Sequence, residues 1–314
     1  MNKLAFLCPG QGAQAVGMGA DLIEKYELAK RRFEEADEAL GFSISKLCFE
    51  GPAEKLQLTA NTQPAILTVS VILGELLREN GVVPSVAGGH SLGEYSALVL
   101  AGVIDFKDAV LLVHKRGEFM QEAVPVGKGG MAAILGLTDE VIEEVCAEVQ
   151  KTVGEVQAVN YNCPGQTVIA GTIEGVTKAA EELKAKGAKK AVVLPVSAPF
   201  HSSLMKPAAE KLAVEIEKLE WKDPAFPVVA NVDGKLQKDA KTIKANLIAQ
   251  AASPVKWIDC VKTMTEFGAD TFIEAGPGKT LAGFNKRIDR KLTTLNAENE
   301  ESLKKVLDYF KEVG

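Results

Sequence analysis

The sequence predicts an α/β protein with a mostly parallel sheet and a small inserted domain, and three observations support this. Short apolar runs alternate with segments of helical periodicity along most of the chain, as in sheets whose two faces are covered by helices. Glycines flank a serine where one such run gives way to a helix, at Gly89–Gly93. Between residues 127 and 197 the expected elements follow the order β-α-β-β-α-β, which is the ferredoxin-like arrangement.

The N-terminal part begins with a buried strand and continues mainly as helices. An apolar run over Lys3–Cys8 predicts the strand, and the turn Pro9–Gly12 ends it. Helical spacing, an Asn80-Gly81 C-cap and an Asp105 N-cap predict the elements that follow. These are helices over about 21–40, 63–79, 92–100 and 105–123, and a β-branched strand over 82–88.

The middle of the chain supplies the inserted domain. Its pattern predicts strands over 131–135, 156–161, 167–170 and 191–196, and helices over 139–151 and 174–186. Thr138 is the expected N-cap of the first helix, and Gly187 ends the second. We therefore expect residues 127–197 to be the ferredoxin-like insertion, entered through the glycine-rich stretch 127–130. Residues 1–126 and 198–314 then form the large α/β domain.

The C-terminal part resumes the large domain. We expect a helix from His201 to about Leu219, a strand over 228–232, helices over 240–251 and 255–267, and a strand over 271–274. That last strand enters the turn Gly276-Pro277-Gly278. The charged segment 298–313 is expected to form an amphipathic helix with one solvated face.

The bulk composition excludes several function classes. A formal net charge of −6 argues against nucleic acid or an anionic membrane as the main partner. The five cysteines include no CxxC pair, so neither a disulfide framework nor a metal site is indicated. The apolar run at the N-terminus is too short for a signal peptide. We therefore expect a cytoplasmic protein. We also expect a monomer, although no feature of the composition bears on the oligomeric state.

The segment Gly89-His90-Ser91-Leu92-Gly93 has the strand-turn-helix context of a nucleophile elbow. Its glycines permit a sharp turn, and the helix N-terminus favours the negative charge that develops during attack. The backbone N–H of Leu92 would donate to a tetrahedral oxyanion. A turn that only packs a helix on the sheet would also need glycines, but strand, turn and helix together favour a catalytic Ser91.

A serine nucleophile needs a base, and the chain contains three histidines. His90 precedes Ser91 in the turn, so its side chain should point away from the hydroxyl. His114 falls within an amphipathic helix and is expected to be structural. By elimination His201 is the expected general base, with a helix-capping or surface histidine as the alternative.

Arg116, on the helix after the elbow helix, has two interpretations. If it faces a closed pocket, its guanidinium would bind a substrate carboxylate through two parallel hydrogen bonds. A solvated helix arginine is the other interpretation, and the residues alone leave both open.

Six segments together resemble the malonyl-coenzyme A:acyl carrier protein transacylases of dissociated fatty-acid synthesis. Each is weakly specific, but their number and order along nearly the whole chain are highly specific. They are Pro9-Gly10-Gln11-Gly12, Gly89–Gly93, Lys115-Arg116-Gly117, Pro199-Phe200-His201-Ser202, Gln250 with Ser253-Pro254-Val255, and Glu274-Ala275-Gly276-Pro277-Gly278. The resemblance implies an α/β-hydrolase-like core around the ferredoxin-like insertion.

The resemblance also implies a role for each candidate residue. Ser91 would carry the acyl group, His201 would take and return protons, and the backbone carbonyl of Gln250 would orient the histidine. The backbone N–H groups of Gln11 and Leu92 would form the oxyanion hole. Arg116 would bind the malonyl carboxylate.

The implied reaction is a ping-pong transfer of malonyl from coenzyme A to the phosphopantetheine thiol of acyl carrier protein, without a metal or redox cofactor. Because acyl carrier proteins are acidic, docking would need a basic face. The candidates are Lys189-Lys190 and the group Lys286, Arg287, Arg290 and Lys291, although solvated surface charge is the commoner reason for such clusters.

Three other functions share some of these features. A serine esterase or thioesterase would let water deacylate Ser91 and would not need Arg116. A non-catalytic scaffold that binds carrier proteins would not need Ser91, His201, Gln11 and Arg116 together. An acyltransferase of polyketide synthesis would share the whole set, although Pro199-Phe200-His201 is typical of malonyl rather than branched extender units.

Overall fold

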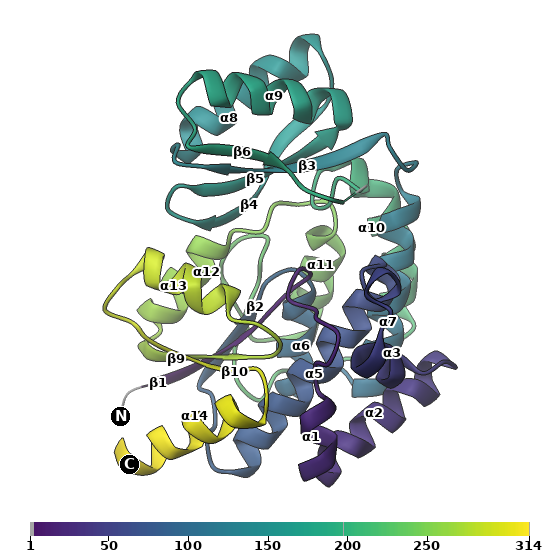
Figure 1. The fold of residues 1–314 in the computed structure, drawn as a ribbon, viewed down its shortest axis with the longest axis vertical. Helices are drawn as coiled ribbons and strands as arrows, with labels where there is room; N and C mark the ends of the chain where they lie inside the picture. Colours follow the sequence, from purple (N-terminus) through teal and green to yellow (C-terminus); the bar gives the residue numbers. More distant parts are fainter. Residues whose placement is uncertain (1–2, 197, 314) are drawn as a thin grey trace.

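The computed structural model describes residues 3–196 and 198–313, which form two α/β units, one above the other in Figure 1. The larger unit is built on a six-stranded sheet in the order β10-β9-β1-β2-β7-β8. All neighbouring strands are parallel except β7 and β8, so the predicted mostly parallel sheet is confirmed. The strands are β1 (Lys3–Cys8), β2 (Val86–Gly89), β7 (Val228–Val229), β8 (Leu236–Gln237), β9 (Ala269–Ala275) and β10 (Thr293–Ala297).

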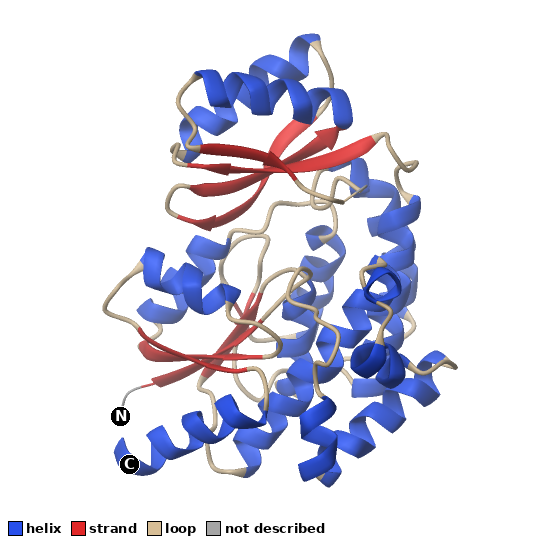
Figure 2. Cartoon of the chain, in the orientation of Figure 1, coloured by secondary structure: helices blue, strands red, loops and turns tan. Residues whose placement is uncertain are grey.

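Helices cover both faces of this sheet, because successive side chains of a strand point to opposite sides. On β1, Phe6 joins the cluster beneath α5 (Thr59–Glu79) and α6 (Leu92–Leu100). Its neighbour Leu7 joins the cluster beneath α12 (Trp257–Glu266) and α13 (Thr280–Ile288). Figure 2 shows the strands between these two groups of helices. The other helical elements of this unit are α1 (Ala20–Lys25), α2 (Glu27–Leu40), α3 (Ile44–Glu50), α4 (Ala53–Leu56), α7 (Phe106–Glu122), η1 (Ser203–Met205), α10 (Lys206–Glu217), α11 (Ala240–Gln250) and α14 (Glu300–Val313).

The smaller unit is a four-stranded antiparallel sheet in the order β4-β5-β3-β6, with two helices on the face away from the larger unit (Figure 1). Both the chain order and the strand pairing agree with the expected ferredoxin-like arrangement. The elements are β3 (Gly129–Leu135), α8 (Asp139–Thr152), β4 (Val156–Cys163), β5 (Gln166–Thr172), α9 (Ile173–Ala185) and β6 (Lys190–Val193). All of them fall within 127–197; the proposed boundary residue Ser197 and residues 1, 2 and 314 lie outside the described residues.

Apolar packing and backbone hydrogen bonds fix the small sheet above the large one. Its free face packs Met131 and Val168 against Met120 and Phe200 of the larger unit. At the same interface the N–H of Val255 donates to the carbonyl of Val159 at 2.7 Å, and the N–H of Tyr161 donates to Val255 at 3.0 Å. The small sheet therefore covers the end of the large sheet at which β2 finishes.

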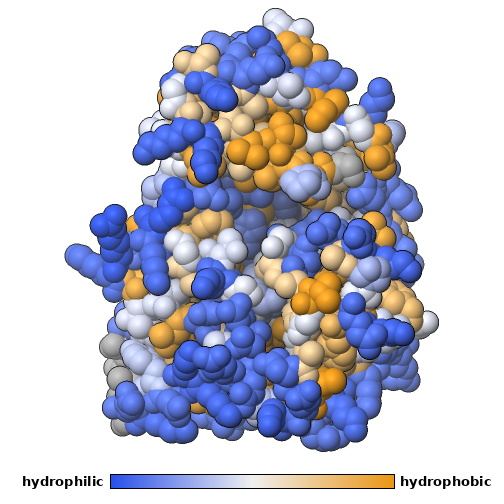
Figure 3. All heavy atoms as spheres, in the orientation of Figure 1, coloured by the Kyte–Doolittle hydropathy of each residue, from blue (hydrophilic) through white to orange (hydrophobic). Residues whose placement is uncertain are grey.

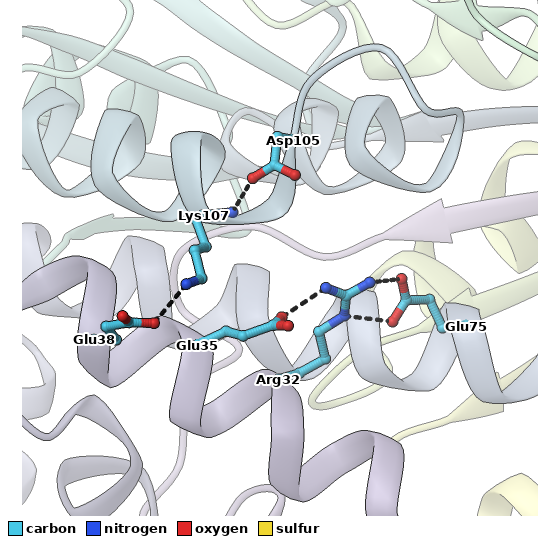
Figure 4. A network of polar contacts seen from close by, with 6 residues as sticks. All are labelled: Arg32, Glu35, Glu38, Glu75, Asp105 and Lys107. Atoms are coloured by element: carbon cyan, nitrogen blue, oxygen red, sulfur yellow. Dashed lines mark hydrogen bonds and ion pairs between the residues drawn. The ribbon is translucent and has the colours of Figure 1, made fainter.

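Charged contacts tie together α2, α5 and α7, the last two of which supply residues to the site below. Arg32 of α2 makes a two-pronged contact with Glu75 of α5, at 2.8 and 2.5 Å (Figure 4). Lys107 of α7 contacts Glu38 of α2 in the same view. Such two-pronged arginine–carboxylate pairs fix geometry as well as adding stability.

Helix α5 begins at Thr59, earlier than predicted, and continues through Pro64. A proline inside a helix leaves the carbonyl four residues earlier without its N–H donor. His114 Nδ1 lies 2.8 Å from that oxygen, on Ala60, and so takes the place of the missing donor. This contact gives His114 of α7 the structural position that the sequence predicted.

Two helix predictions were wrong in detail. The helix expected over 21–40 is interrupted at Tyr26, whose extended backbone (φ −127°, ψ 118°) separates α1 from α2. The interruption allows Leu22 and Phe33 to pack in the same core. The helix expected to begin at His201 begins only at Ser203, as a 3-10 turn, because His201 has φ 64°. The sequence also did not predict α3, α4, β8, α13 or β10, which are short or lie at the edge of the sheet.

No helix within the described residues is both long and apolar enough to cross a membrane.

Candidate active site

Ser91 lies where β2 ends and α6 begins, in a strained backbone conformation with φ 53° and ψ −105°. Positive φ is uncommon for residues other than glycine and often marks functional sites. The two flanking glycines are required by close approach of the backbone. A Cβ on Gly89 would lie 1.9 Å from the carbonyl carbon of Gly93, and one on Gly93 would lie 2.0 Å from the carbonyl oxygen of Cys8.

Asn231, just after β7, holds the elbow in this conformation. Its Oδ1 accepts the N–H of Ser91 at 2.7 Å, and its Nδ2 donates to the carbonyl of Gly89 at 2.8 Å. These two side-chain bonds link the segments after β2 and β7, beyond the last backbone pair of the two strands. Sequence reasoning missed this residue, although a polar residue inside the apolar run predicted as the strand 228–232 was a usable signal.

His201 is the histidine in contact with the serine. Its Nε2 lies 2.7 Å from Ser91 Oγ, and its Nδ1 lies 2.9 Å from the backbone oxygen of Gln250. A carbonyl only accepts, so Nδ1 carries the proton and Nε2 presents its lone pair to the hydroxyl. Burial, and secondly the charge of Arg116, lower the pKa of His201 to about 3, so the imidazole is neutral.

Arg116 is buried at the same place, with 1% of its surface exposed. Its Nη1 donates to Gln63 Oε1 at 2.7 Å, and its Nη2 donates to Gln250 Oε1 at 2.9 Å and to Ser91 Oγ at 3.1 Å. Its guanidinium carbon is 5.3 Å from the ring centre of Tyr95. The structure therefore excludes the solvated helix arginine that the sequence had left open.

The expected oxyanion donors line the same cavity as Ser91, which has a volume of about 130 Å³. Leu92 is the first residue of α6, so its N–H has no intrahelical partner. Gln11 follows β1 in an exposed turn. Close packing brings that turn to the elbow, because a Cβ on Gly10 would lie 2.3 Å from the carbonyl oxygen of His90.

Both units contribute to the cavity wall. Met131, Leu194 and Val196 come from the smaller unit, and Met120 and Phe200 from the larger one. On the face shown in Figure 3 the surface is hollowed between the two units. An acyl group bound at Ser91 would therefore contact apolar side chains of both units, and exclusion of water from the cavity would strengthen charge interactions inside it.

A buried carboxylate, Glu94, lies behind the serine and was also missed from the sequence. It accepts the N–H of Asn231 at 3.0 Å, Gln250 Nε2 at 2.8 Å and Gln237 Nε2 at 3.0 Å. Burial raises its pKa to about 7, although these hydrogen bonds oppose the shift. An acidic residue in the mainly apolar segment of α6 was the available signal.

The remaining candidates occupy other positions. His90 directs Nε2 to Asn162 Oδ1 at 2.8 Å, and its ring lies against Trp257. Among residues 3–196 and 198–313 no group of three or more His, Cys, Asp or Glu side chains could hold a metal ion. Lys189, Lys190, Lys286, Arg290 and Lys291 are exposed. Arg287 binds Gln166 Oε1 at 2.7 Å and the Pro164 carbonyl at 3.0 Å, and so links α13 to the smaller unit.

Comparison with known proteins identifies the family and several relatives of this chain. The family model described as an acyl transferase domain matches residues 5–302. The chain is 49% identical over 312 residues to a malonyl CoA-acyl carrier protein transacylase of Bacillus subtilis, covering 99% of this chain and 98% of that protein. It is 50% identical over 304 residues to the protein of that name in Escherichia coli, covering 96% and 97%.

Solved structures agree with the sequence comparison. An acyl carrier protein S-malonyltransferase of Vibrio cholerae superposes with a TM-score of 0.94 at 48% identity, covering 97% of this chain and 99% of that one. A malonyl-transacylase in complex with its type II PKS acyl-carrier protein gives a TM-score of 0.95 at 46% identity, covering 98% and 99%.

Proposed function

Because the chain belongs to the acyl transferase family, we propose that it transfers a malonyl group from coenzyme A to the phosphopantetheine thiol of acyl carrier protein, through an ester on Ser91. It is then a malonyl-coenzyme A:acyl carrier protein S-malonyltransferase that supplies fatty-acid synthesis in the cytoplasm. The proposed reaction uses coenzyme A thioester as a substrate and needs no metal or redox cofactor.

The observation that carries this proposal is the buried guanidinium of Arg116 beside the nucleophile, 3.1 Å from Ser91 Oγ. A buried cation without a charged partner is unfavourable unless a ligand brings the opposite charge. A malonyl thioester has its carboxylate one methylene from the reacting carbonyl, so both ends can meet these two side chains at once. The carboxylate can take the Nη2 hydrogen bond that Ser91 now accepts.

Acylation follows from the contacts of Ser91. His201 Nε2 takes the hydroxyl proton while Oγ attacks the thioester carbonyl. The resulting oxyanion is stabilised by the N–H groups of Gln11 and Leu92, each contributing on the order of 3 kcal/mol. The carbon–sulfur bond then breaks, the imidazolium returns its proton to the leaving thiolate, and coenzyme A departs from malonyl-Ser91.

Transfer repeats these steps with a different thiol. The phosphopantetheine thiol of the carrier protein gives its proton to His201 and attacks the ester carbonyl. Collapse of the second tetrahedral intermediate breaks the carbon–oxygen bond, and Ser91 recovers its proton from the imidazolium. The Gln250 carbonyl keeps the imidazole in the required tautomer throughout, in place of the carboxylate of a triad.

Intact-protein mass spectrometry tests this function directly. Incubation with malonyl-coenzyme A should give one malonyl adduct, mapped to Ser91 and absent in Ser91→Ala. Addition of holo-acyl carrier protein should then remove the adduct and yield malonyl-carrier protein. An adduct lost to water at the same rate with and without carrier protein would instead indicate a thioesterase.

The carrier protein decides between two biosynthetic settings. The structural relative bound to a type II PKS acyl-carrier protein shows that this architecture also occurs with polyketide carriers. We propose the fatty-acid carrier as the physiological acceptor. Comparing kcat/KM for the two kinds of carrier protein from the source organism tests the choice, and a higher value for a polyketide carrier would reverse it.

A further inference from the structure

A buried amide lies between a buried guanidinium and a buried carboxyl group behind the active site. Gln250 accepts a hydrogen bond from Arg116 Nη2 on its Oε1, at 2.9 Å. Its Nε2 donates to Glu94 Oε2 at 2.8 Å and to the Ser91 carbonyl at 3.0 Å. Gln250 and Glu94 are fully buried, and Arg116 is 1% exposed.

Only one orientation of the Gln250 amide satisfies both neighbours. A guanidinium has donors only, and both oxygens of Glu94 accept N–H groups here. Turning the amide around would set its NH₂ against Arg116 and its oxygen against Glu94, so both contacts would be repulsive. Glu94 and the Ser91 carbonyl on one side, and Arg116 on the other, therefore determine which end of Gln250 faces the active site.

The same residue also supports the catalytic histidine, because the backbone oxygen of Gln250 accepts from His201 Nδ1 at 2.9 Å. Glu94 additionally accepts the N–H of Asn231, whose side chain holds the Ser91 elbow. Ser91, His201 and Arg116 are thus all linked, directly or through one residue, to the contact between Glu94 and Gln250.

We propose that Glu94 is a positioning residue for malonyl transfer: it orients the Gln250 amide so that the guanidinium of Arg116 is held toward the substrate carboxylate. The inference rests on the proposed function. It makes Glu94 a determinant of selectivity for malonyl over acetyl groups, although the carboxylate touches no substrate. Removing a residue that positions a substrate-binding group without touching the substrate can change rates on the order of 100-fold.

The informative variant is Glu94→Met, which keeps the approximate side-chain length and removes every acceptor. The ratio of kcat/KM for Ser91 acylation by malonyl- and acetyl-coenzyme A should fall by about tenfold or more. The Gln250 amide then keeps only the Ser91 carbonyl and Arg116 as close partners, so the acceptor of Arg116 is held less firmly. Glu94→Gln should give a smaller fall. The new amide oxygen can take the place of Glu94 Oε2, and its NH₂ group then faces Gln237. The Gln237 amide can rotate to present its oxygen, because its other partner, Asn246, is only half-buried and can rotate as well.

Glu274→Met is the matched control. Glu274 is likewise fully buried, burial likewise raises its pKa to about 7, and it accepts the N–H groups of Leu281 and Ala282. Its contacts involve neither Gln250 nor Arg116. This variant should lose stability but keep the malonyl-to-acetyl ratio.

A second variant keeps the inference testable if Glu94→Met does not fold. Gln250→Leu retains the backbone carbonyl for His201 but has no amide, so it should lose the same selectivity. If Glu94→Met folds, the double variant should be no less selective than Gln250→Leu alone, because both changes act through one contact.

The outcomes separate the inference from the proposed function. If the wild-type protein forms no malonyl-Ser91, the proposed function fails. If it does form malonyl-Ser91 but Glu94→Met or Gln250→Leu keeps the full malonyl preference, only the positioning role is overturned. A ratio that falls equally in Glu274→Met would also overturn it, since the effect would then reflect general destabilisation.

Discussion

Arg116 and His201 converge on a single oxygen atom: Arg116 Nη2 lies 3.1 Å from Ser91 Oγ, and His201 Nε2 lies 2.7 Å from it. A cation this close makes it harder for the imidazole to become charged. The charge adds to the effect of burial, and together they lower the pKa of His201 to about 3. The residue that selects the substrate thus also keeps the base in its neutral, reactive form.

The pH dependence of acylation should reflect this arrangement. A base works when neutral, so a lowered pKa keeps His201 active as pH falls through its ordinary value of 6.5. We expect kcat/KM for acetyl-coenzyme A to persist below that pH in the wild-type protein. Arg116→Met removes the nearby charge, so the pKa of His201 should rise and the acid limb should move to higher pH. Stopped-flow acylation rates measure both profiles, and an unmoved limb would exclude electrostatic coupling between the two residues.

Removing the guanidinium should separate malonyl from acetyl transfer. In Arg116→Ala the malonyl carboxylate would be buried without a partner, at a cost of about 3–5 kcal/mol. Because each 1.4 kcal/mol is roughly tenfold in rate, kcat/KM for malonyl-coenzyme A should fall by roughly 100- to 4,000-fold. Acetyl transfer should change far less. Parallel assays with both thioesters measure the difference, and equal losses would refute the carboxylate-binding role.

The elbow should tolerate no side chain at its second glycine. In Gly93→Ala the new Cβ would lie 2.0 Å from the backbone oxygen of Cys8, so β1 and α6 would have to separate. We expect a loss of at least about 3 kcal/mol in the free energy of unfolding and loss of Ser91 acylation. Gly283→Ala is the control, because a Cβ there meets no atom within 4 Å and Gly283 lies inside helix α13. It should stabilise the protein by up to about 1 kcal/mol; chemical denaturation measures both values.

Local signals explain the parts of the fold that could be predicted. The strand Lys3–Cys8 and the helix Leu92–Leu100 have the predicted bounds, because a buried apolar run and two flanking glycines mark them in the sequence. Asp105 caps α7 as expected, accepting the N–H of Lys107. By contrast, β10 and α13 were missed. Strand β10 is a half-buried edge strand, and neither element has the continuous apolar pattern of a central one.

The site was predictable only where chemistry is encoded locally or by family resemblance. Ser91 lies in its own motif, and elimination among three histidines indicated His201. The backbone of His201, with φ 64°, depends instead on a turn in which Ser202 Oγ donates to the Pro199 carbonyl at 2.7 Å. Asn231 and Glu94 act through partners more than 130 positions away in sequence. Contacts between residues so far apart in the chain cannot be predicted from periodicity or from motif spacing.

Carrier-protein docking should depend on the exposed basic residues at the start of β6 and at the end of α13. Strand β6 begins at the exposed Lys190, and shortly after its end Leu194 and Val196 line the cavity, so an acidic carrier bound along β6 would lie beside the reaction centre. Lys190→Glu should raise KM for holo-acyl carrier protein by roughly three- to tenfold, because charge complementarity mainly increases the rate of encounter.

Lys286→Glu tests the second cluster, whereas Arg287 is a poor choice because it already binds the smaller unit. The control for Lys190→Glu is Lys311→Glu on α14, at the end of the molecule away from β6 (Figure 1). Each reversal should leave Ser91 acylation by malonyl-coenzyme A unchanged, and an unchanged KM for the carrier protein would remove that cluster from the docking face.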